Sequence, residues 1–332
     1  MPIGQQMNAA QARVVDPILT NHARGYTNAE MIGRFLFPTV TMPTRAAKRI
    51  EFDRSSFRRR RTRRAPGAPI ARLEFGYEGK PVNLHQEALA SVIPIEHQEE
   101  ANEIPGINLQ QTGVDTVLAV ISLEKEIQQA QVARNAASYA STNKIALSGT
   151  NKWSSPDSDP KTQVFDGKEV IRSRIGRRPN TLVLGGKVTS SLQKHPKLLE
   201  HFKHTNSSAI TIPMLQSYFD IENVVSGDAI YDTDDTTTVD VWGGDVIMAY
   251  VPPEGMRAMP LPSYGYTYQL ANHPLVEAVE WDGDIRSWKN AVLDEFSAEL
   301  VGADAGFLFQ AAFGACGAAG REGRGSLITP PP

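Results

Sequence analysis

Residues 109–139, LQQTGVDTVLAVISLEKEIQQAQVARNAASY, set the architecture expected for this chain. Apolar side chains recur there at helical spacing, at Val114, Val117, Leu118 and Ile121 and then at Ile127 and Ala130. Ile104-Pro105-Gly106 breaks the chain before them, and no glycine or proline occurs between positions 114 and 148. The pattern predicts one helix over residues 109–143, on the order of 50 Å long at 1.5 Å per residue.

Three interpretations fit such a helix: a long helix of an ordinary enzyme, a coiled-coil strand, or a spine that carries other parts of a subunit. Lys125 and Gln128 interrupt a continued heptad seam, which disfavours the coiled coil. The polar side chains of the helix are expected to face solvent. They are Lys125, Gln128, Gln129, Gln131, Arg134 and Asn135.

Length and composition favour a globular chain of about two domains, at ~150 residues per domain. The 332 residues are 41% hydrophobic and carry a net charge of −3, which disfavours a general polyanion binder. The single cysteine, Cys316, excludes an intrachain disulfide and a cysteine metal cluster. Met1–Ala12 lacks the apolar core of a signal peptide, and no run approaches ~18 apolar residues. Neither secretion nor a membrane-spanning helix is therefore expected.

Residues 1–44 have the irregular pattern of an extended arm. Prolines punctuate them, and their apolar residues are spaced apart except for a group at Phe35, Leu36 and Phe37. A short helix is expected from Asn28 to Phe35, with Asn28 as its N-cap. The arm is expected to bind another surface rather than to form a domain of its own.

Residues 45–100 predict a long two-stranded ribbon. Apolar and polar residues alternate around Ile50–Phe52 and again around Leu73–Tyr77, which is typical of two strands. An isolated hairpin is only marginally stable in water. The ribbon is therefore expected to lie on a surface that the rest of this chain does not offer.

The connection between those two strands is strongly basic. It contains seven arginines and no acidic residue: Arg54, Arg58, Arg59, Arg60, Arg61, Arg63 and Arg64. Without these seven charges, a chain of net charge −3 is left with −10. Three interpretations remain open: a solvated loop, a nucleic-acid contact, or docking on an acidic patch of a second copy. Candidate acidic targets are Glu99, Glu100 and Glu103.

Beyond the long helix the pattern alternates between helices and strands. Asp159-Pro160 predicts an N-cap and first helical residue, and Gly176 ends that helix. A buried strand at Thr181–Leu184 turns at Gly185-Gly186, and helices follow that open at His195-Pro196 and Pro213. Further strands are expected at Asn223–Val225, Val239–Trp242, Val246–Val251, Tyr264–Leu270, Val276–Trp281, Asp284–Leu293 and Phe296–Val301. Gly, Ala and Pro dominate residues 314–332, which are expected to form a flexible tail.

No catalytic, metal or cofactor motif can be defended in this sequence. Gly185-Gly186-Lys187 lacks both the first glycine and the Ser/Thr of a phosphate-binding loop. His195, His201 and His204 have only Glu200 nearby as a further metal ligand, and Asp232–Asp235 lacks the glycine and terminal glutamate of a calcium loop. Gly-x-Ser-x-Gly, His-Glu-x-x-His and Rossmann glycine motifs do not occur. We expect no enzymatic activity and no cofactor.

The order of these features resembles the major capsid proteins of tailed bacteriophages. The segments that carry the resemblance are Leu36-Phe37-Pro38, Arg64–Gly67, Trp153–Pro160, Arg178–Leu184 followed by His195-Pro196, Trp242-Gly243 and Val301–Leu308. The resemblance covers about residues 15–310 and depends on the order and spacing of these segments rather than on one motif.

The resemblance implies the α+β coat fold shared by tailed phages, herpesvirus capsid floors and encapsulins. Its expected parts are an N-terminal arm (1–44), an extended β-hairpin loop (45–100), a peripheral domain (101–178 and 260–300) with a spine helix (109–143), and an α/β axial domain (179–259 and 301–313). The seven arginines of the loop, and Phe35, Leu36 and Phe37 of the arm, are then expected to contact neighbouring subunits.

The function implied is that of a structural shell subunit, a major capsid protein. It would assemble in the host cytoplasm into hexamers and pentamers of a virion capsid around double-stranded DNA, which it contacts non-specifically. Expected partners are a separate scaffolding protein and a portal protein, with a decoration protein as a further candidate. Some family members cross-link Lys to Asn, but Lys48 and Lys80 have no matching motif here. The alternatives are an encapsulin-like compartment, an enzyme with an unrecognised site, and a nucleic-acid-binding module.

Overall fold

The computed structural model describes residues 15–26, 31–50, 79–103, 108–203, 210–234, 237–256 and 261–314. The arginine-rich connection and the tail beyond residue 314 lie outside these ranges. Helices and strands are mixed along the described chain, which confirms the expected α+β class. Among the described helices, none combines the length and the apolar character that a membrane crossing requires.

The long helix predicted from the periodicity is α4, Leu109–Arg134. Asn108 caps its start by accepting a hydrogen bond from the Gln111 amide. The helix ends earlier than the expected position 143, although no glycine or proline stops it. Asn135 leaves the helix in an extended conformation, and its side chain accepts a hydrogen bond from the Ala137 amide, which begins a separate turn. This competing side-chain bond ends the helix.

The polar face of α4 is not turned to solvent as expected. Four of its side chains bond to other elements: Lys125 to Asp294, Gln128 to Glu87, Gln129 to Thr267 and Arg134 to Asp245. Gln131 and Asn135 are exposed. The helix is therefore enclosed on several sides, which supports the interpretation of α4 as a spine.

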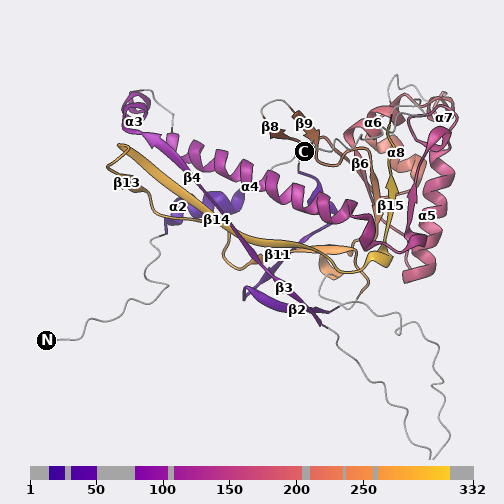
Figure 1. Ribbon diagram of the computed structural model, residues 1–332, viewed down its shortest axis with the longest axis horizontal. Coiled ribbons are helices and arrows are strands. Elements are labelled where there is room, and N and C mark those ends of the chain that lie inside the picture. Colours follow the sequence, from indigo (N-terminus) through magenta and orange to yellow (C-terminus); the bar gives the residue numbers. More distant parts are fainter. Residues whose placement is uncertain are drawn as a thin grey trace, which may run out of the picture.

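A six-stranded sheet packs against α4, with β14, Ser287–Leu300, at its centre (Figure 1). On one edge β14 pairs antiparallel with β4, His85–Pro94. On its other edge it pairs with β11, Gly265–Leu270, β12, Leu275–Val276, and β13, Glu280–Asp282. The arm contributes β1, Thr39–Met42, which lies parallel to β11.

The two strands expected at Asp284–Leu293 and Phe296–Val301 are in fact the single strand β14. Asp294 and Glu295 look like a polar break in the sequence, but both are buried with partners. Asp294 accepts a 3.0 Å bond from Lys125, and Glu295 accepts bonds of 2.7 and 2.8 Å from Arg45. These partners are 169 and 250 positions away along the chain, so the local pattern does not reveal them.

A small apolar core joins the arm to α4 and the sheet. α2, Pro17–Gly25, begins at Asp16, whose carboxylate accepts bonds from the Ile18 and Leu19 amides. Leu19 and Ala23 pack with Val114, Val117, Leu118, Ile121, Val276, Val292 and Phe296. The helix expected at Asn28–Phe35 is only a turn at Gly33–Phe35 in its described portion, because residues 27–30 lie outside it.

A second sheet forms the core of the other part of the molecule (Figure 1). Its strands in order are β5, Lys144–Ala146; β15, Gly306–Gln310; β10, Val246–Ala249; β6, Thr181–Gly185; and β7, Asn223–Gly227. The helices around it are α5, Pro160–Ile175; α6, Gly186–Gln193; α7, Pro196–His201; and α8, Ile212–Phe219. The expected strand Val239–Trp242 is instead β9, Thr237–Asp240, which pairs with β8, Ile230–Asp234, outside this sheet.

The caps predicted for α5 are present. Asp159 accepts a hydrogen bond from the Thr162 amide, Pro160 is the first helical residue, and Gly176 closes the helix at φ 68°. Because these signals lie within one turn of each helix end, the sequence predicts both boundaries correctly.

The position of α5 differs from the expectation, which grouped residues 101–178 with the long helix. Gly167 lies directly against Met248 of β10 and Phe309 of β15. A side chain at this position would separate the helix from the strands. α5 therefore packs on the second sheet.

The base of the expected ribbon is present. β2, Ala46–Ile50, pairs antiparallel with β3, Gly79–Asn83. Figure 1 shows this pair extending from β14 on the side opposite α4. Most of the two strands expected from the alternating pattern falls in residues 51–78, outside the described ranges. The boundaries 45–100 are too wide, because β4 pairs along most of β14 and α3, Ile95–Asn102, follows it directly.

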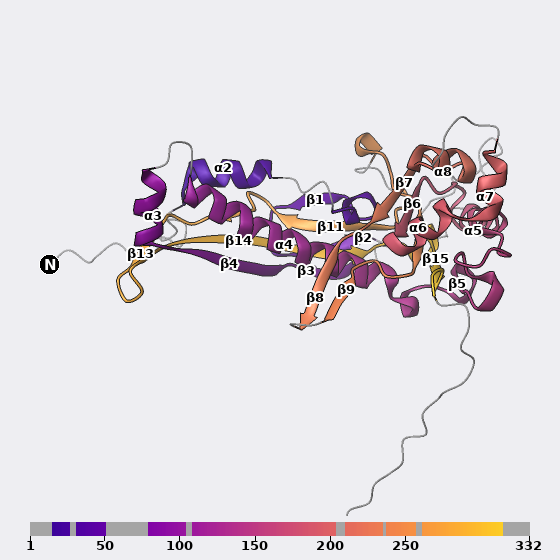
Figure 2. The same ribbon diagram turned by 90° about the horizontal axis from the view of Figure 1, so that it is seen from above.

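Figures 1 and 2 show an elongated and a compact part. We call α2–α4 with the six-stranded sheet the elongated part, and α5–α8 with the five-stranded sheet the compact part. α3 and β13 lie at the end of the elongated part that is farthest from the compact part.

Candidate assembly surfaces

Glu126 of α4 joins three segments of the subunit. Its Oε1 accepts a 2.6 Å hydrogen bond from Trp242 Nε1 and a 3.1 Å bond from the Ile32 amide, and its Oε2 accepts a 2.8 Å bond from the Gly33 amide. Burial raises the pKa of this carboxyl, and the three donors oppose that rise. The carboxylate holds the root of the arm, the long helix and the core of the compact part in one arrangement.

Our sequence interpretation missed Glu126, although the sequence contains a signal for it. Glu126 lies four residues before Ala130 and seven before Ala133, and both alanines are buried. An acid on the apolar stripe of a helix needs buried donors. The identity of those donors, on Trp242 and at Gly33, is not evident from spacing.

The structure corrects the expected role of two arm residues. Leu36 and Phe37 are 0% exposed and belong to the main core of their own subunit, so their side chains offer no surface to a neighbour. The chain enters the sheet as β1 directly after them, which draws both into the core, where Phe37 packs on Tyr264. Phe35 is half-buried, with the Arg34 guanidinium 5.4 Å from its ring, and it retains surface for a contact.

Arg45 anchors the base of the ribbon. Its guanidinium donates two parallel hydrogen bonds to the buried carboxylate of Glu295, one from Nε and one from Nη2. This pair fixes where β2 begins relative to β14 of the six-stranded sheet. The seven arginines of the ribbon follow a few residues later, outside the described residues, so their contacts remain an expectation.

The acidic surface expected to receive them is exposed on α3 and the residue after it. Glu96, Glu99, Glu100 and Glu103 are all exposed. No lysine or arginine occurs between residues 95 and 103. We call these four glutamates the acidic face of α3. Since α3 lies at the far end of the elongated part, this face is available to another molecule (Figures 1 and 2).

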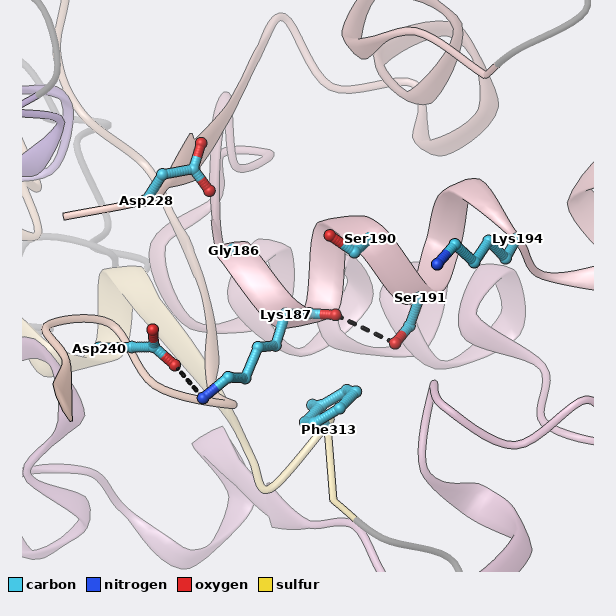
Figure 3. A pocket seen from close by; sticks show the side chains of 9 residues that line it. Gly186, Lys187, Ser190, Ser191, Lys194, Asp228, Asp240 and Phe313 are labelled. Atoms are coloured by element: carbon cyan, nitrogen blue, oxygen red, sulfur yellow. Dashed lines mark hydrogen bonds and ion pairs between the residues drawn. The ribbon is translucent and has the colours of Figure 1, made fainter. Parts of the chain in front are cut away.

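A cleft of about 390 Å³ beside α6 is the clearest candidate for a small-molecule site (Figure 3). Lys187 pairs with Asp240 at 2.5 Å, and Ser191 donates a hydrogen bond to the Lys187 carbonyl. The Asp228 carboxylate lies beside Gly186 at the start of the helix, where a phosphate group would have to bind. The described residues that line the cleft include neither histidine nor cysteine. This arrangement supplies no Ser–His or Cys–His pair, and the Asp228 carboxylate opposes an anion at the start of the helix.

His195 and Ser158 form a buried pair with the spacing of a catalytic dyad, 3.1 Å between Nε2 and Oγ. Nε2 also lies 3.0 Å from the Ser155 carbonyl, which can only accept, so this nitrogen carries the proton. Nδ1 accepts a bond from the Lys197 amide. An imidazole in this tautomer cannot take a proton from Ser158, and the pair instead ties the start of α7 to the loop before α5.

The histidines also fail as a metal site where the structure describes them. His201 packs edge-on against Phe202 and Tyr218. No group of three or more potential metal-ligating side chains occurs among the described residues. His204 lies outside these ranges, as does Asp235 of the acidic turn.

Comparison with known proteins identifies close relatives of the chain. No family model matches it. The major capsid protein of Burkholderia phage BcepMu is 38% identical over 302 residues, which cover 90% of this chain and 97% of that protein. A solved structure of a phage-related protein from Bordetella bronchiseptica RB50 has a TM-score of 0.78 and 42% identity, over 91% of this chain and 98% of that one.

A more distant solved structure shows the same fold. The virus-like particle protein of Pyrococcus furiosus has a TM-score of 0.51 at 9% identity, over 88% of this chain and 96% of that one. Together with 38% identity along almost the whole BcepMu protein, these findings show that the chain belongs to the major capsid protein family of bacteriophages.

Proposed function

We propose that this major capsid protein assembles into hexamers and pentamers of an icosahedral virion shell that encloses double-stranded DNA. The observation that carries the proposal is the 38% identity with the BcepMu major capsid protein, since it spans 97% of that protein. It also favours a phage shell over an encapsulin-like compartment. The proposed role is structural, without enzymatic activity or a cofactor.

The described surfaces support contacts between subunits. The two-stranded base of the ribbon, β2 with β3, leaves the sheet, and an isolated ribbon of this kind has little stability of its own. The proposal places the ribbon on a neighbouring copy, with Arg54, Arg58, Arg59, Arg60, Arg61, Arg63 and Arg64 near the acidic face of α3. Opposite charges on two parts of the same chain favour association between copies. Phe35 contributes a smaller contact from the arm.

The proposal also includes partners that the shell requires. A separate scaffolding protein would direct assembly in the host cytoplasm, a portal protein would occupy one vertex, and a decoration protein is a further candidate. Contacts with the packaged DNA would be non-specific and mediated by its phosphates.

Electron microscopy of the purified full-length protein tests this function. Closed shells built from six-fold and five-fold capsomers are expected, alone or after addition of a scaffolding protein. A uniform population of compact monomers under both conditions would rule the proposal out.

A further inference from the structure

The outer edge of β4 has a defined set of backbone groups without a strand to pair with. The Ile95 amide donates to the Arg286 carbonyl, which makes 95 and 286 a hydrogen-bonded pair in the antiparallel register of β4 and β14. In such a ladder bonded and non-bonded pairs alternate. Odd-numbered residues of β4 therefore bond to β14, and Gln86, Ala88, Ala90 and Val92 direct their N–H and C=O groups outward.

In the part of the chain that the structure describes, β14 is the only strand that pairs with β4. Exposed edges of this length are usually protected by lysine, by proline or by a bulge. The sequence of β4, HQEALASVIP, has no lysine, and its only proline is the last residue. The outward edge is thus free to accept a further strand.

A groove of about 500 Å³ lies at the C-terminal end of this edge. Four consecutive residues of β4, from Ser91 to Pro94, line it. Consecutive residues of a strand point to opposite faces, so a space that all four line must lie beside the backbone itself. The opposite wall is formed by α3 and the first turns of α4, with His97, Glu100, Ala101, Leu109, Thr112 and Thr116.

The chemistry of the groove specifies an occupant. Val92 is 49% exposed there, and Ile93 and Leu109 add apolar surface. Glu100 lines the groove, and Glu96 and Glu99 lie on the same short helix. An extended peptide with basic residues around an apolar one satisfies both features, with main-chain bonds for affinity and side chains for specificity.

We infer that the outward edge of β4, together with this groove at its end, receives residues 54–64 of a second copy as an added β-strand. This segment, RSSFRRRRTRR, has eleven residues and matches the ten residues of β4 in length. Its backbone bonds to the outward groups of Ala88, Ala90 and Val92, Phe57 enters the apolar groove, and the arginines lie beside the acidic face of α3. The inference rests on the proposed function and specifies the site and the mode of the contact.

A proline at position 92 tests the mode of binding in the full-length protein. Val92→Pro removes one outward N–H and leaves the bonds to β14 intact, and the extended Ser91 before it suits a proline. Val92→Thr is the matched control, because it has the shape of valine and keeps the N–H. The proline variant is expected to need an about tenfold higher protein concentration for assembly than the threonine variant, as sedimentation measures it. Equal assembly of the two variants overturns the inference.

Disulfide trapping tests the position of the occupant without a change in the backbone. Two proteins are prepared in a Cys316→Ser background, one with Val92→Cys and the other with Phe57→Cys, and are assembled together under oxidising conditions. A disulfide between the two different chains is expected in the particles. Particles without this mixed dimer overturn the inference, even if Val92→Pro fails to fold.

The fourfold variant Arg58–Arg61→Ser separates this inference from the proposed function. If it weakens assembly while the Val92 variants and the cysteine pair give the overturning results, the ribbon binds elsewhere on its neighbour and only the inference fails. If wild-type protein forms no shells either alone or with a scaffolding protein, the proposed function fails as well.

Discussion

Trp242 donates a 2.6 Å hydrogen bond from Nε1 to Oε1 of Glu126, across 116 positions of the chain. The indole belongs to the core of the compact part, and the carboxylate belongs to the long helix. Glu126 also accepts bonds from the amides that begin the turn of the arm. One buried carboxylate therefore sets the relation between three segments that have no common local sequence signal.

Glu126→Gln should destabilise the subunit. The amide group can accept bonds only through its oxygen, and its NH₂ would face the Gly33 amide, which is also a donor. We expect the free energy of unfolding to fall by about 1–3 kcal/mol, measured by urea denaturation. Glu124→Gln is the matched control on the exposed side of the helix, with an expected change within about 0.5 kcal/mol. An equal loss of stability in the two variants would contradict the role of Glu126 in joining the three segments.

Ionisation of Glu126 should make the stability of the protein depend on pH. Burial raises the pKa of its carboxyl above the ordinary 4.5, so the folded state binds a proton at pH values where the unfolded state has lost it. This group therefore lowers stability as the pH rises from 4.5 through the raised pKa. Denaturation curves across that window should show a smaller loss in Glu126→Gln than in wild type. An identical slope in both proteins would exclude this assignment.

His195 should change the stability with pH in the opposite direction to Glu126. Burial lowers its pKa below the ordinary 6.5, and this effect outweighs the bond from its Nε2–H to the Ser155 carbonyl, which favours the protonated imidazole. The unfolded state binds the proton first, so stability present above pH 6.5 is lost as the pH falls toward the lowered pKa. His195→Asn keeps an acceptor at this helix cap and should reduce that loss in denaturation at decreasing pH. A variant that loses stability as steeply as wild type would refute the assignment.

Gly227→Ala should disturb Trp242 directly. A Cβ at this position would lie 2.2 Å from the indole ring, which is 0% exposed and has no space to withdraw. We expect a loss of about 1–3 kcal/mol in the free energy of unfolding, with a change in tryptophan fluorescence. Gly255→Ala provides the comparison, because nothing lies within 4 Å of the added methyl group. A Gly227→Ala protein as stable as Gly255→Ala would show that the indole tolerates displacement.

The parts of this fold that the sequence predicts correctly are those that depend on residues close together in the chain. Asp159, Pro160 and Gly176 fix both ends of α5, and the apolar run at Thr181–Leu184 identifies β6, because caps and short buried strands depend on neighbouring residues. The apolar spacing of α4 is equally local. These elements follow from patterns of a few residues.

The remaining features depend on partners far along the chain. β14 continues through Asp294 and Glu295 only because Lys125 and Arg45 neutralise them from other segments. Leu36 and Phe37 face inward because β1 joins the sheet beside β11. From the sequence, the candidate contact could be predicted only as binding of a basic segment to an acidic surface. The groove beside β4 is formed by residues of β4, α3 and α4, and no local pattern shows that these three elements meet.

The central claim is that the basic ribbon of one copy binds the surface of another, and assembly of Arg58–Arg61→Ser at several salt concentrations tests it most directly. Arg58–Arg61→Lys is the control that retains the charge. We predict that the serine variant remains largely unassembled and loses most of the salt dependence, while the lysine variant assembles at low salt and dissociates as salt rises. Shells of the serine variant that form at the wild-type concentration, with the wild-type response to salt, would contradict the account.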